Sequence, residues 1–387
     1  MTDLLCQPVL VNWFTKALYQ NVGFHALPDQ MKMTKLIKPK RATVRDVAEQ
    51  AAVSIATVSR WLNDSIKLPE VTAERIRRAV VLLRYEPNLH ARRLSLGRTD
   101  TLALVVPDIA DPFFALLAGS VEAAAESLGF GIVLCATLNR PTREIDYIGR
   151  VYRNHVDGLL FATNHPDDGT LLAAMQGQSN VVLLDEDVNG VNAPKVFCDN
   201  RGGGQEATEH LIAAGHRRIG FVGGVEGVMS AVERCEGYAS ALQAANIPFD
   251  PALTDFGGYT AEHGRSAARR LLCLPEPPTA IFASSDQIAI GALEVLRDAG
   301  VSIPQDMSIV AYDDVAPFKF FSPAVTAVRQ PVADMGRRGV ERLVGFLTNT
   351  STDTIEERLP VHLIQRGSVA PPASISRLSR LIKAWSK

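Results

Sequence analysis

The sequence predicts a small all-α unit followed by a large α/β body that is built from two lobes. Between residues 43 and 83 the apolar residues recur at helical spacing. From Thr101 onward, short apolar runs alternate with amphipathic segments, a pattern typical of parallel sheets with crossover helices. These roughly 270 residues are too many for one compact domain with a single doubly wound sheet. The alternation occurs twice, with a break near Asp199–Gly204, so we expect two lobes.

The composition is that of a folded protein with one basic region. The chain has 387 residues, is 47% hydrophobic and 21% charged, and carries a net charge of −2. Residues 31–98, however, hold 15 Lys and Arg against 6 Asp and Glu, a net of +9 that leaves −11 for the rest. A basic module joined to an acidic body fits DNA contact at one end of the chain.

The cysteines and the apolar runs argue against several classes of protein. The five cysteines are scattered and form no C-x-x-C pair, so neither a disulfide framework nor a zinc site is expected, and a reducing cytoplasm is indicated. No apolar run approaches the ~20 residues of a membrane helix, and residues 1–30 lack the pattern of a secretory signal. We therefore expect a cytoplasmic protein with no metal and no membrane partner.

Residues 1–40 do not share the pattern that begins at Thr43. They could be an accessory N-terminal segment, or they could result from an upstream start codon, with the working chain beginning at Met31 or Met33. We favour the second interpretation. The basic run from Lys32 to Arg41 could contact DNA phosphates, although such a run is more often only solvated.

The basic region predicts three short helices. Thr43 can cap the first, with Asp46 at capping-box spacing, and Ser54 can cap the second. Thr72 can cap a third helix that runs to about Leu83 and ends before a proline. These caps set the boundaries of a small helical unit at residues 41–86.

The first two helices form a characteristic pair. Val58 and Trp61 of the second helix face Val47 of the first, so the other side of the second helix is left free, at Ile55, Ala56, Ser59 and Arg60. This is the helix-turn-helix arrangement, in which the second helix enters the major groove of DNA. Taken alone, the same pattern would also fit any small amphipathic helical hairpin.

A short basic segment links the helical unit to the body. Residues 89–94 could be a plain linker, or a short helix with two arginines and an exposed leucine. So short a helix would be stable only against a partner copy or DNA. An exposed leucine between basic residues suits a wedge in the minor groove.

The elements of the body follow from apolar runs bounded by glycine, aspartate and proline. A ligand would lie in a cleft where the carboxyl ends of the strands meet. The tail at 371–387 is expected to be weakly docked. We expect strands at 101–109, 131–137, 157–162, 181–186, 195–200, 218–224, 253–258, 279–286 and 307–314, and helices at 120–130, 144–156, 171–176, 202–215, 231–246, 261–274 and 288–300.

Several motifs in a fixed order resemble the lactose-repressor (LacI/GalR) family of bacterial transcription regulators. The similarity covers about 85% of the chain, from Thr43 to Ser368. The motifs include V-x-D-V-A-x-x-A-x-V-S-x-x-T-V-S-R-x-L-N at 44–63, Y-x-P-N-x-x-A-R-x-L at 85–94, P-D-I-x-D-P-F-F at 107–114, G-H-R-R-I-G-F-V-G-G at 215–224 and Y-D-D at 312–314.

The resemblance implies a helix-turn-helix headpiece and a periplasmic-binding-protein-like body with flavodoxin-like lobes. Three segments would cross between the lobes, near Asp199–Asn200, after Asp313 and near Arg329–Pro331. The domains would be a headpiece at 41–86, a hinge at 87–99 and an effector-binding and dimerisation domain at 100–370, with lobe 1 at about 100–199 and 314–330 and lobe 2 at about 200–313 and 331–370.

The resemblance also implies the DNA contacts. Ile55 and Ala56 would make apolar contacts with bases, for instance with a thymine methyl group, and Arg60 could pair with guanine. Leu94 and its copy in a second subunit would open a flexible central base step. The remaining contacts would go mainly to phosphates, which position rather than specify, from Thr43, Ser54, Thr57, Asn63, Asn88, Arg92 and Arg93.

In the cleft, the resemblance implies a sugar-like effector. Phe113 and Phe114 would offer aromatic faces to a sugar ring, and Arg234 and Asp286 would bind hydroxyl groups bidentately. Weaker candidates by position are Asp111, Asp185, Ser230 and Tyr259. Each of these residues could instead be a structural contact within the core or between the lobes.

These implications predict a sequence-specific DNA-binding repressor whose operator affinity is controlled by a small sugar. It would be a homodimer, possibly a tetramer, because two half-sites of a near-palindrome are read. Helix 120–128 could form part of the subunit interface or pack on its own sheet. Induction and co-repression would use the same cleft, and the sequence does not separate them.

Other functions were weighed against this one. An enzyme is not expected, because the glycine clusters at 202–204 and 220–224 lack the spacing of a nucleotide-binding loop and no catalytic triad stands out; no cofactor is expected either. A sugar-binding protein without DNA reading, and a regulator that responds to a protein partner, remain alternatives.

Overall fold

The computed structural model describes residues 42–63, 65–85, 98–153, 156–166, 168–177, 180–350 and 355–372. The chain divides into two compact units, Met1–Asn88 and Leu89–Lys387, and each is described by itself. The predictions for the N-terminal extension, for the hinge residues Asn88, Arg92, Arg93 and Leu94, and for the tail beyond 372 fall outside the described residues.

The first unit contains three helices, α2 (Val44–Ala51), α3 (Ile55–Leu62) and α4 (Glu70–Leu82). Their core is formed by Val47, Val58 and Ile76, which are fully buried, and by several alanines. Small alanines let three short helices approach closely, so a few apolar side chains suffice for this core.

The caps of the first two helices are as the sequence predicts. Thr43 and Asp46 form a capping box, in which the backbone N–H of Thr43 donates to Asp46 Oδ2 at 2.7 Å. The backbone N–H of Thr57 donates to Ser54 Oγ at 3.1 Å. The predicted cap at Thr72 is wrong: α4 begins at Glu70, because the carbonyl of Pro69 already accepts from the backbone N–H of Thr72 at 2.9 Å.

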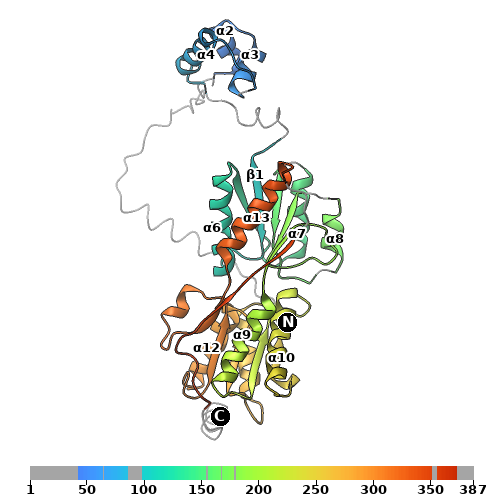
Figure 1. Ribbon diagram of the computed structural model, residues 1–387, viewed down its shortest axis with the longest axis vertical. Helices are drawn as coiled ribbons and strands as arrows, with labels where there is room; N and C mark the ends of the chain where they lie inside the picture. Colours follow the sequence, from blue (N-terminus) through green and yellow to red (C-terminus); the bar gives the residue numbers. More distant parts are fainter. Residues whose placement is uncertain are drawn as a thin grey trace, which may run out of the picture. The chain divides into compact units, whose positions relative to one another are not determined.

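The second unit is built from two lobes, each a six-stranded sheet with helices on both faces (Figure 1). In lobe 1 all strands are parallel, in the order β11-β5-β4-β3-β1-β2. Helices α6 and α13 cover one apolar face, and α7 and α8 cover the other. The elements of lobe 1 are β1 (Thr101–Val106), α6 (Pro112–Ser127), β2 (Gly131–Ala136), α7 (Pro141–Tyr152), β3 (Gly158–Phe161), α8 (Thr170–Met175), β4 (Val181–Leu184), β5 (Lys195–Cys198), α13 (Val332–Leu347) and β11 (Glu356–Leu359).

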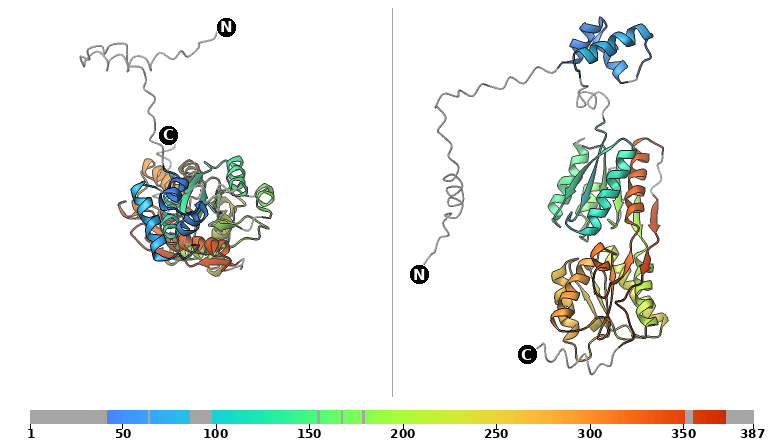
Figure 2. Two further views of the ribbon diagram at one scale, coloured as in Figure 1. Left: turned by 90° about the horizontal axis from the view of Figure 1, so that it is seen from above. Right: turned by 90° about the vertical axis from the view of Figure 1, so that its left-hand side faces the viewer.

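Lobe 2 repeats this plan in the order β12-β10-β9-β8-β6-β7, with only the edge strand β12 antiparallel. Helices α9 and α10 cover one face, and α11 and α12 cover the other. The side view in Figure 2 shows both layered lobes. The elements are α9 (Asn200–Ala213), β6 (Ile219–Gly223), α10 (Met229–Ala244), η1 (Pro251–Leu253), β7 (Thr254–Phe256), α11 (Ala261–Leu272), β8 (Ala280–Ala283), α12 (Asp286–Asp298), β9 (Ser308–Tyr312), η2 (Ala316–Lys319), β10 (Thr326–Arg329) and β12 (His362–Ile364).

The predicted lobe boundaries need correction after residue 313. The first crossing, at Asp199, is where the sequence places it. Residues 314–330 belong to lobe 2, however, because β10 pairs with β9 and Phe318 is buried in the core of lobe 2. Residues 332–359 belong to lobe 1, because α13 packs on α6 and β11 pairs with β5. The second and third crossings therefore lie at 330–331 and 360–361.

The helix predicted at 120–130 begins much earlier, at Pro112. Asp111 caps it by accepting from the backbone N–H of Phe113 at 2.9 Å, and proline is preferred at a first helical position. This early start places Phe113 and Phe114 in the first turn of α6 rather than in a loop. Within the described residues, no helix is long and apolar enough to cross a membrane.

Candidate functional site

The second helix of the first unit presents the residues that the sequence assigns to base reading. Ile55 is 42% exposed, and Ala56 and Arg60 are also exposed. Val58 on the opposite side is fully buried. The fold therefore leaves one side of α3 free.

The polar residues beside α3 have structural partners. The hydroxyls of Ser54 and Thr57 lie 2.8 Å apart, and Ser54 also caps α3. Asn63 follows the last turn of α3 and is half-buried. Thr43 is held in its capping box. Contacts of these residues with phosphates remain predictions.

All eight residues that the sequence assigns to the effector line one cavity between the two lobes. The strands of both lobes end beside it, so loops after β3, β4, β8 and β9 meet there. Sequence reasoning missed four further lining residues. The cavity is lined by Asp111, Phe113, Phe114, Asn164, Asp185, Ser230, Arg234, Tyr259, Ser285, Asp286, Asp313 and Gln330.

Two of the four missed residues could have been found from the repeat. Asp313 directly follows β9 and Asp185 directly follows β4, and these strands hold the same position in their sheets. Both aspartates have left-handed backbone angles, with φ of 65° at Asp185 and 68° at Asp313. Asn164 after β3 and Asp286 after β8 also stand at matching places, because β3 and β8 hold the same position in their sheets. A left-handed residue at a strand end turns the chain, so both strands end abruptly at the cavity.

Arg234 is fixed at the centre of the cleft. Its Nε donates to Asn200 Oδ1 at 2.9 Å and its Nη1 to the carbonyl of Ser284 at 2.7 Å. The guanidinium carbon lies 3.8 Å from the centroid of the Tyr312 ring. Hydrogen bonds and stacking together hold the planar group rigidly, which is the arrangement that recognises hydroxyl pairs.

Four carboxyl groups line the cleft together with this arginine, and burial raises the pKa of each. The pKa of Asp111 is raised to about 6, and those of Asp185 and Asp286 to about 7. Burial also raises the pKa of Asp313, whose Oδ1 accepts from Gln330 Nε2 at 2.6 Å. Asp185 Oδ1 has no hydrogen-bond partner within the described residues. The cleft is thus rich in buried acceptors.

The free volume of the cavity is small. It amounts to about 30 Å³, whereas a single water needs roughly 10–15 Å³. Phe113 and Phe114 pack edge to face with centroids 5.0 Å apart and border the cavity from the core of lobe 1. This structure therefore leaves no room for a sugar ring between the lobes, and a sugar would enter only after they separate.

We expect the stability of the body to fall as the pH rises from about 6.5 to 8. In the unfolded chain Asp185, Glu186 and Asp286 ionise near pH 4, but burial raises their folded pKa to about 7, 8 and 7. Folding therefore takes up protons, and this contribution is lost as the pH rises through the folded pKa values. His210 and His216, whose pKa burial lowers in the folded chain, oppose this trend in part near pH 6.5, because the unfolded chain takes up protons on them there, but the three carboxyl groups outweigh them.

Urea unfolding between pH 6.5 and 8 measures this effect. Asp185→Asn removes one of the titrating groups and should flatten the slope of stability against pH. A free energy of unfolding that stays constant or increases across this range would contradict the burial of these carboxyl groups.

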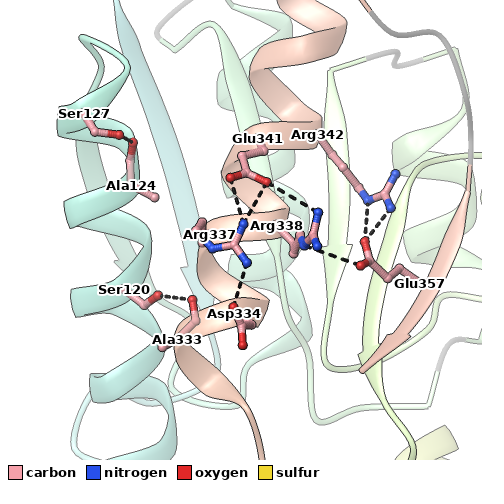
Figure 3. A network of polar contacts seen from close by, with 10 residues as sticks. All are labelled: Ser120, Ala124, Ser127, Ala333, Asp334, Arg337, Arg338, Glu341, Arg342 and Glu357. Atoms are coloured by element: carbon pink, nitrogen blue, oxygen red, sulfur yellow. Dashed lines mark hydrogen bonds and ion pairs between the residues drawn. The ribbon is translucent and has the colours of Figure 1, made fainter. Parts of the chain in front are cut away.

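A larger groove lies on the surface of lobe 1 between α6 and α13, with a volume of about 1060 Å³. Figure 3 shows Ser120 of α6 donating to the carbonyl of Ala333, and Arg337 of α13 held between Asp334 and Glu341. Leu116 on α6 is 59% exposed beside the groove. Within the described residues, no cluster of His, Cys, Asp and Glu is arranged for a metal ion.

Comparison with known proteins gives consistent matches over both units. Residues 43–88 match the family "Bacterial regulatory proteins, lacI family", and residues 208–369 match "Periplasmic binding protein-like domain". The regulator CelR of Thermobifida fusca is 36% identical over 85% of this chain and 98% of its own length. The repressor CytR of Escherichia coli (strain K12) is 32% identical over 84% and 96%. A solved CelR–cellobiose complex aligns with a TM-score of 0.66 at 35% identity, covering 85% of this chain and all of that one.

Proposed function

The chain belongs to the LacI family of bacterial regulatory proteins, and on that basis we propose that it is a repressor whose hold on a DNA operator is controlled by an uncharged saccharide bound between its lobes. The observation that carries the effector part is the cleft in which Asp111 and Asp185 of lobe 1 meet Arg234 and Asp286 of lobe 2. A ligand gripped from both lobes favours the closed arrangement and so shifts the population of lobe arrangements.

The charge of the cleft defines the class of effector. A carboxyl group accepts hydrogen bonds in either protonation state and also donates one when it is protonated, so the four lining carboxyl groups suit a ligand with many hydroxyl groups. To the extent that they are ionised they repel a phosphate or a carboxylate on the ligand, and only one guanidinium lines the cleft to balance them. The related CelR was solved with cellobiose. These points favour a neutral mono- or disaccharide over a sugar phosphate.

We assign operator reading to the free side of α3. Ile55 and Ala56 offer only apolar contact, which suits thymine methyl groups, and Arg60 can pair with guanine O6 and N7. The hinge residues Asn88, Arg92, Arg93 and Leu94 would complete the contact, with Leu94 as the minor-groove wedge. Such a protein acts on DNA in the bacterial cytoplasm.

Operator reading requires two copies of the headpiece, so we propose that the chain works as a dimer. The exposed side of α6 beside α13 is our candidate for part of the subunit contact, because Leu116 and Leu128 are exposed there among small residues. Small residues allow close approach of a second helix, and sedimentation of the purified chain measures the assembly.

The proposed function is tested first by selecting genomic DNA fragments with the purified protein at about physiological salt, where non-specific binding is weak. We expect one short near-palindrome with a flexible central step to be enriched, and a neutral saccharide to change its binding. A response to sugar phosphates alone would overturn the proposed effector class. Failure to enrich any site, with or without sugars, would overturn operator reading.

Arg60→Ala should weaken binding to the selected operator by roughly tenfold or more, because a bidentate pair with guanine contributes about 1–3 kcal/mol. Binding to random DNA should change much less. Electrophoretic mobility shifts with both DNAs measure the two affinities. Arg75→Ala, at an exposed arginine on α4, is the matched control and should change the affinities for the two DNAs by the same small factor, so that the preference for the operator is kept. If Arg60→Ala lost affinity equally for the operator and for random DNA, Arg60 would contact only a phosphate and not a base.

A further inference from the structure

The N-terminal end of α10, residues 229–233, belongs to lobe 2 but contacts lobe 1 in three ways. The first is apolar: Met229 packs against the apolar cluster of lobe 1 that lies under α7 and α8 and includes Val188 and Phe197. Ser230 and Arg234, on the same helix, line the effector cleft. Any change in how this turn is held against lobe 1 therefore also moves residues of the cleft.

The second contact is a helix cap supplied by the other lobe. Val228 stands at the N-cap position of α10 and has no side chain that could cap it, and the first N–H groups of a helix need acceptors. Glu186, which follows β4 of lobe 1, is almost fully buried and accepts from the backbone N–H of Ser230, at 3.1 Å to Oε1 and 3.3 Å to Oε2. Ionised or protonated, this carboxyl keeps an acceptor oxygen for that amide.

The third contact is an ion pair across the lobes. Arg358 on β11 of lobe 1 donates from Nη1 to Oε2 of Glu233 on α10, at 2.7 Å. The Glu233 side chain is 16% exposed, so the pair is screened less than a surface pair. Arg358 is itself oriented by Glu356 and lies near the ring of Phe197. Its partner Glu233 lies within one turn of Ser230.

We propose that Glu186 is a positioning residue of the effector cleft: together with the Arg358–Glu233 pair it clasps the first turn of α10 to lobe 1 and sets how readily the lobes close. The clasp acts on the cleft through Ser230, whose amide Glu186 holds, and through Arg234 on the same helix, but Glu186, Glu233 and Arg358 do not themselves line the cleft. The stability that the clasp gives to the contact between α10 and lobe 1 does not depend on any ligand. Its effect on effector affinity rests on the proposed function. The effector is bound tightly only when the lobes are closed. Weakening the clasp reduces the fraction of protein with closed lobes, and the affinity for the effector falls in proportion.

Amide hydrogen exchange of the ligand-free, full-length protein tests the clasp directly. In Glu186→Ala the Ser230 amide should exchange about tenfold faster, since local opening sets the exchange rate. Glu186→Gln, which keeps an acceptor oxygen, should restore most of the protection. Glu233→Ala should also accelerate exchange at Ser230, although Glu233 does not bind that amide, because the clasp opens as a unit.

The matched control is Glu236→Ala. Glu236 lies on the same helix, but it pairs with Arg201 of lobe 2 rather than with lobe 1. It should leave exchange at Ser230 unchanged. If Glu233→Ala and Glu236→Ala behave alike, or if Glu186→Ala leaves Ser230 protected, the clasp is overturned.

Titration with cellobiose as the probe measures the link to the effector cleft. Glu186→Ala and Glu233→Ala should each bind it several-fold more weakly than the unsubstituted protein, and Glu236→Ala should bind it equally well. If the unsubstituted protein binds no cellobiose, the choice of saccharide has failed while the exchange experiment still decides on the clasp. If Glu186→Ala exchanged fast at the Ser230 amide but bound cellobiose with unchanged affinity, Glu186 would be only a local helix cap and not a positioning residue.

Discussion

Replacing Arg234 by alanine should abolish the response to the effector while leaving operator binding intact. The guanidinium is held by Asn200 and the carbonyl of Ser284 and stacks on Tyr312, so no neighbouring group can take its place. Its removal leaves the buried Asp185 and Asp313 without their nearest cation. Truncating one partner of a buried, hydrogen-bonded contact with the effector costs about 2–5 kcal/mol, which is a loss of roughly 30-fold or more in effector affinity.

Operator binding with and without the saccharide panel measures this effect, with circular dichroism as the check on folding. Arg217→Ala, an exposed arginine in the same lobe, is the matched control and should respond normally. Arg234→Lys keeps the charge but loses the planar fork, so we expect it to regain only part of the response. A folded Arg234→Ala protein with an unchanged response would show that the arginine only supports the lobes.

Gly237→Ala should destabilise the body by about 3 kcal/mol, because α9 and α10 cross in direct backbone contact at this glycine. A Cβ at Gly237 would lie 2.6 Å from the backbone nitrogen of Gln205 and closer still to the carbonyl oxygen of Arg201. Both are backbone atoms, so the helices would have to separate, and overpacking of this kind typically costs 1–3 kcal/mol or more. The shift would also displace Arg234, so effector affinity should fall with stability.

Urea unfolding measures the loss, and Gly149→Ala provides the matched control. Gly149 is also inside a helix, but a Cβ there would meet only the flexible end of Arg153 at 3.6 Å or more. That substitution should stabilise by up to about 1 kcal/mol, because alanine is the better helix former. If both substitutions changed stability equally, the close crossing of α9 and α10 would not explain why residue 237 has to be glycine.

Most of the cleft could be predicted because the resemblance to the LacI/GalR family implies its residues, and several of them also stand at the ends of local elements. Asp111 precedes a proline at a helix start, and Asp286 follows a strand. Asp313 and Asn164 follow strands in the same way, but only the alignment of the two sheets shows that their loops converge with the others. The aromatic pair Phe113 and Phe114 was correctly placed beside the cavity, yet the structure shows both largely buried.

The sequence by itself determined most of the elements up to β9 and the caps of the first two helices. Helical spacing fixed the core of Val47, Val58 and Ile76, and the capping box at Thr43 depends only on a residue three positions away. The repeating strands and helices fixed two parallel sheets. These features rest on contacts between near neighbours in the chain, so the pattern of residues is sufficient to predict them.

Only the tertiary structure decided which lobe receives residues 314–359, and how the lobes meet. The short strands β10, β11 and β12 could pair at the edge of either sheet, and the choice depends on the packing of α13 against α6. Glu186 likewise has no partner nearby in the chain, and its contact with Ser230 spans 44 residues. Contacts between distant segments depend on the shape of both lobes, and no local pattern carries that information.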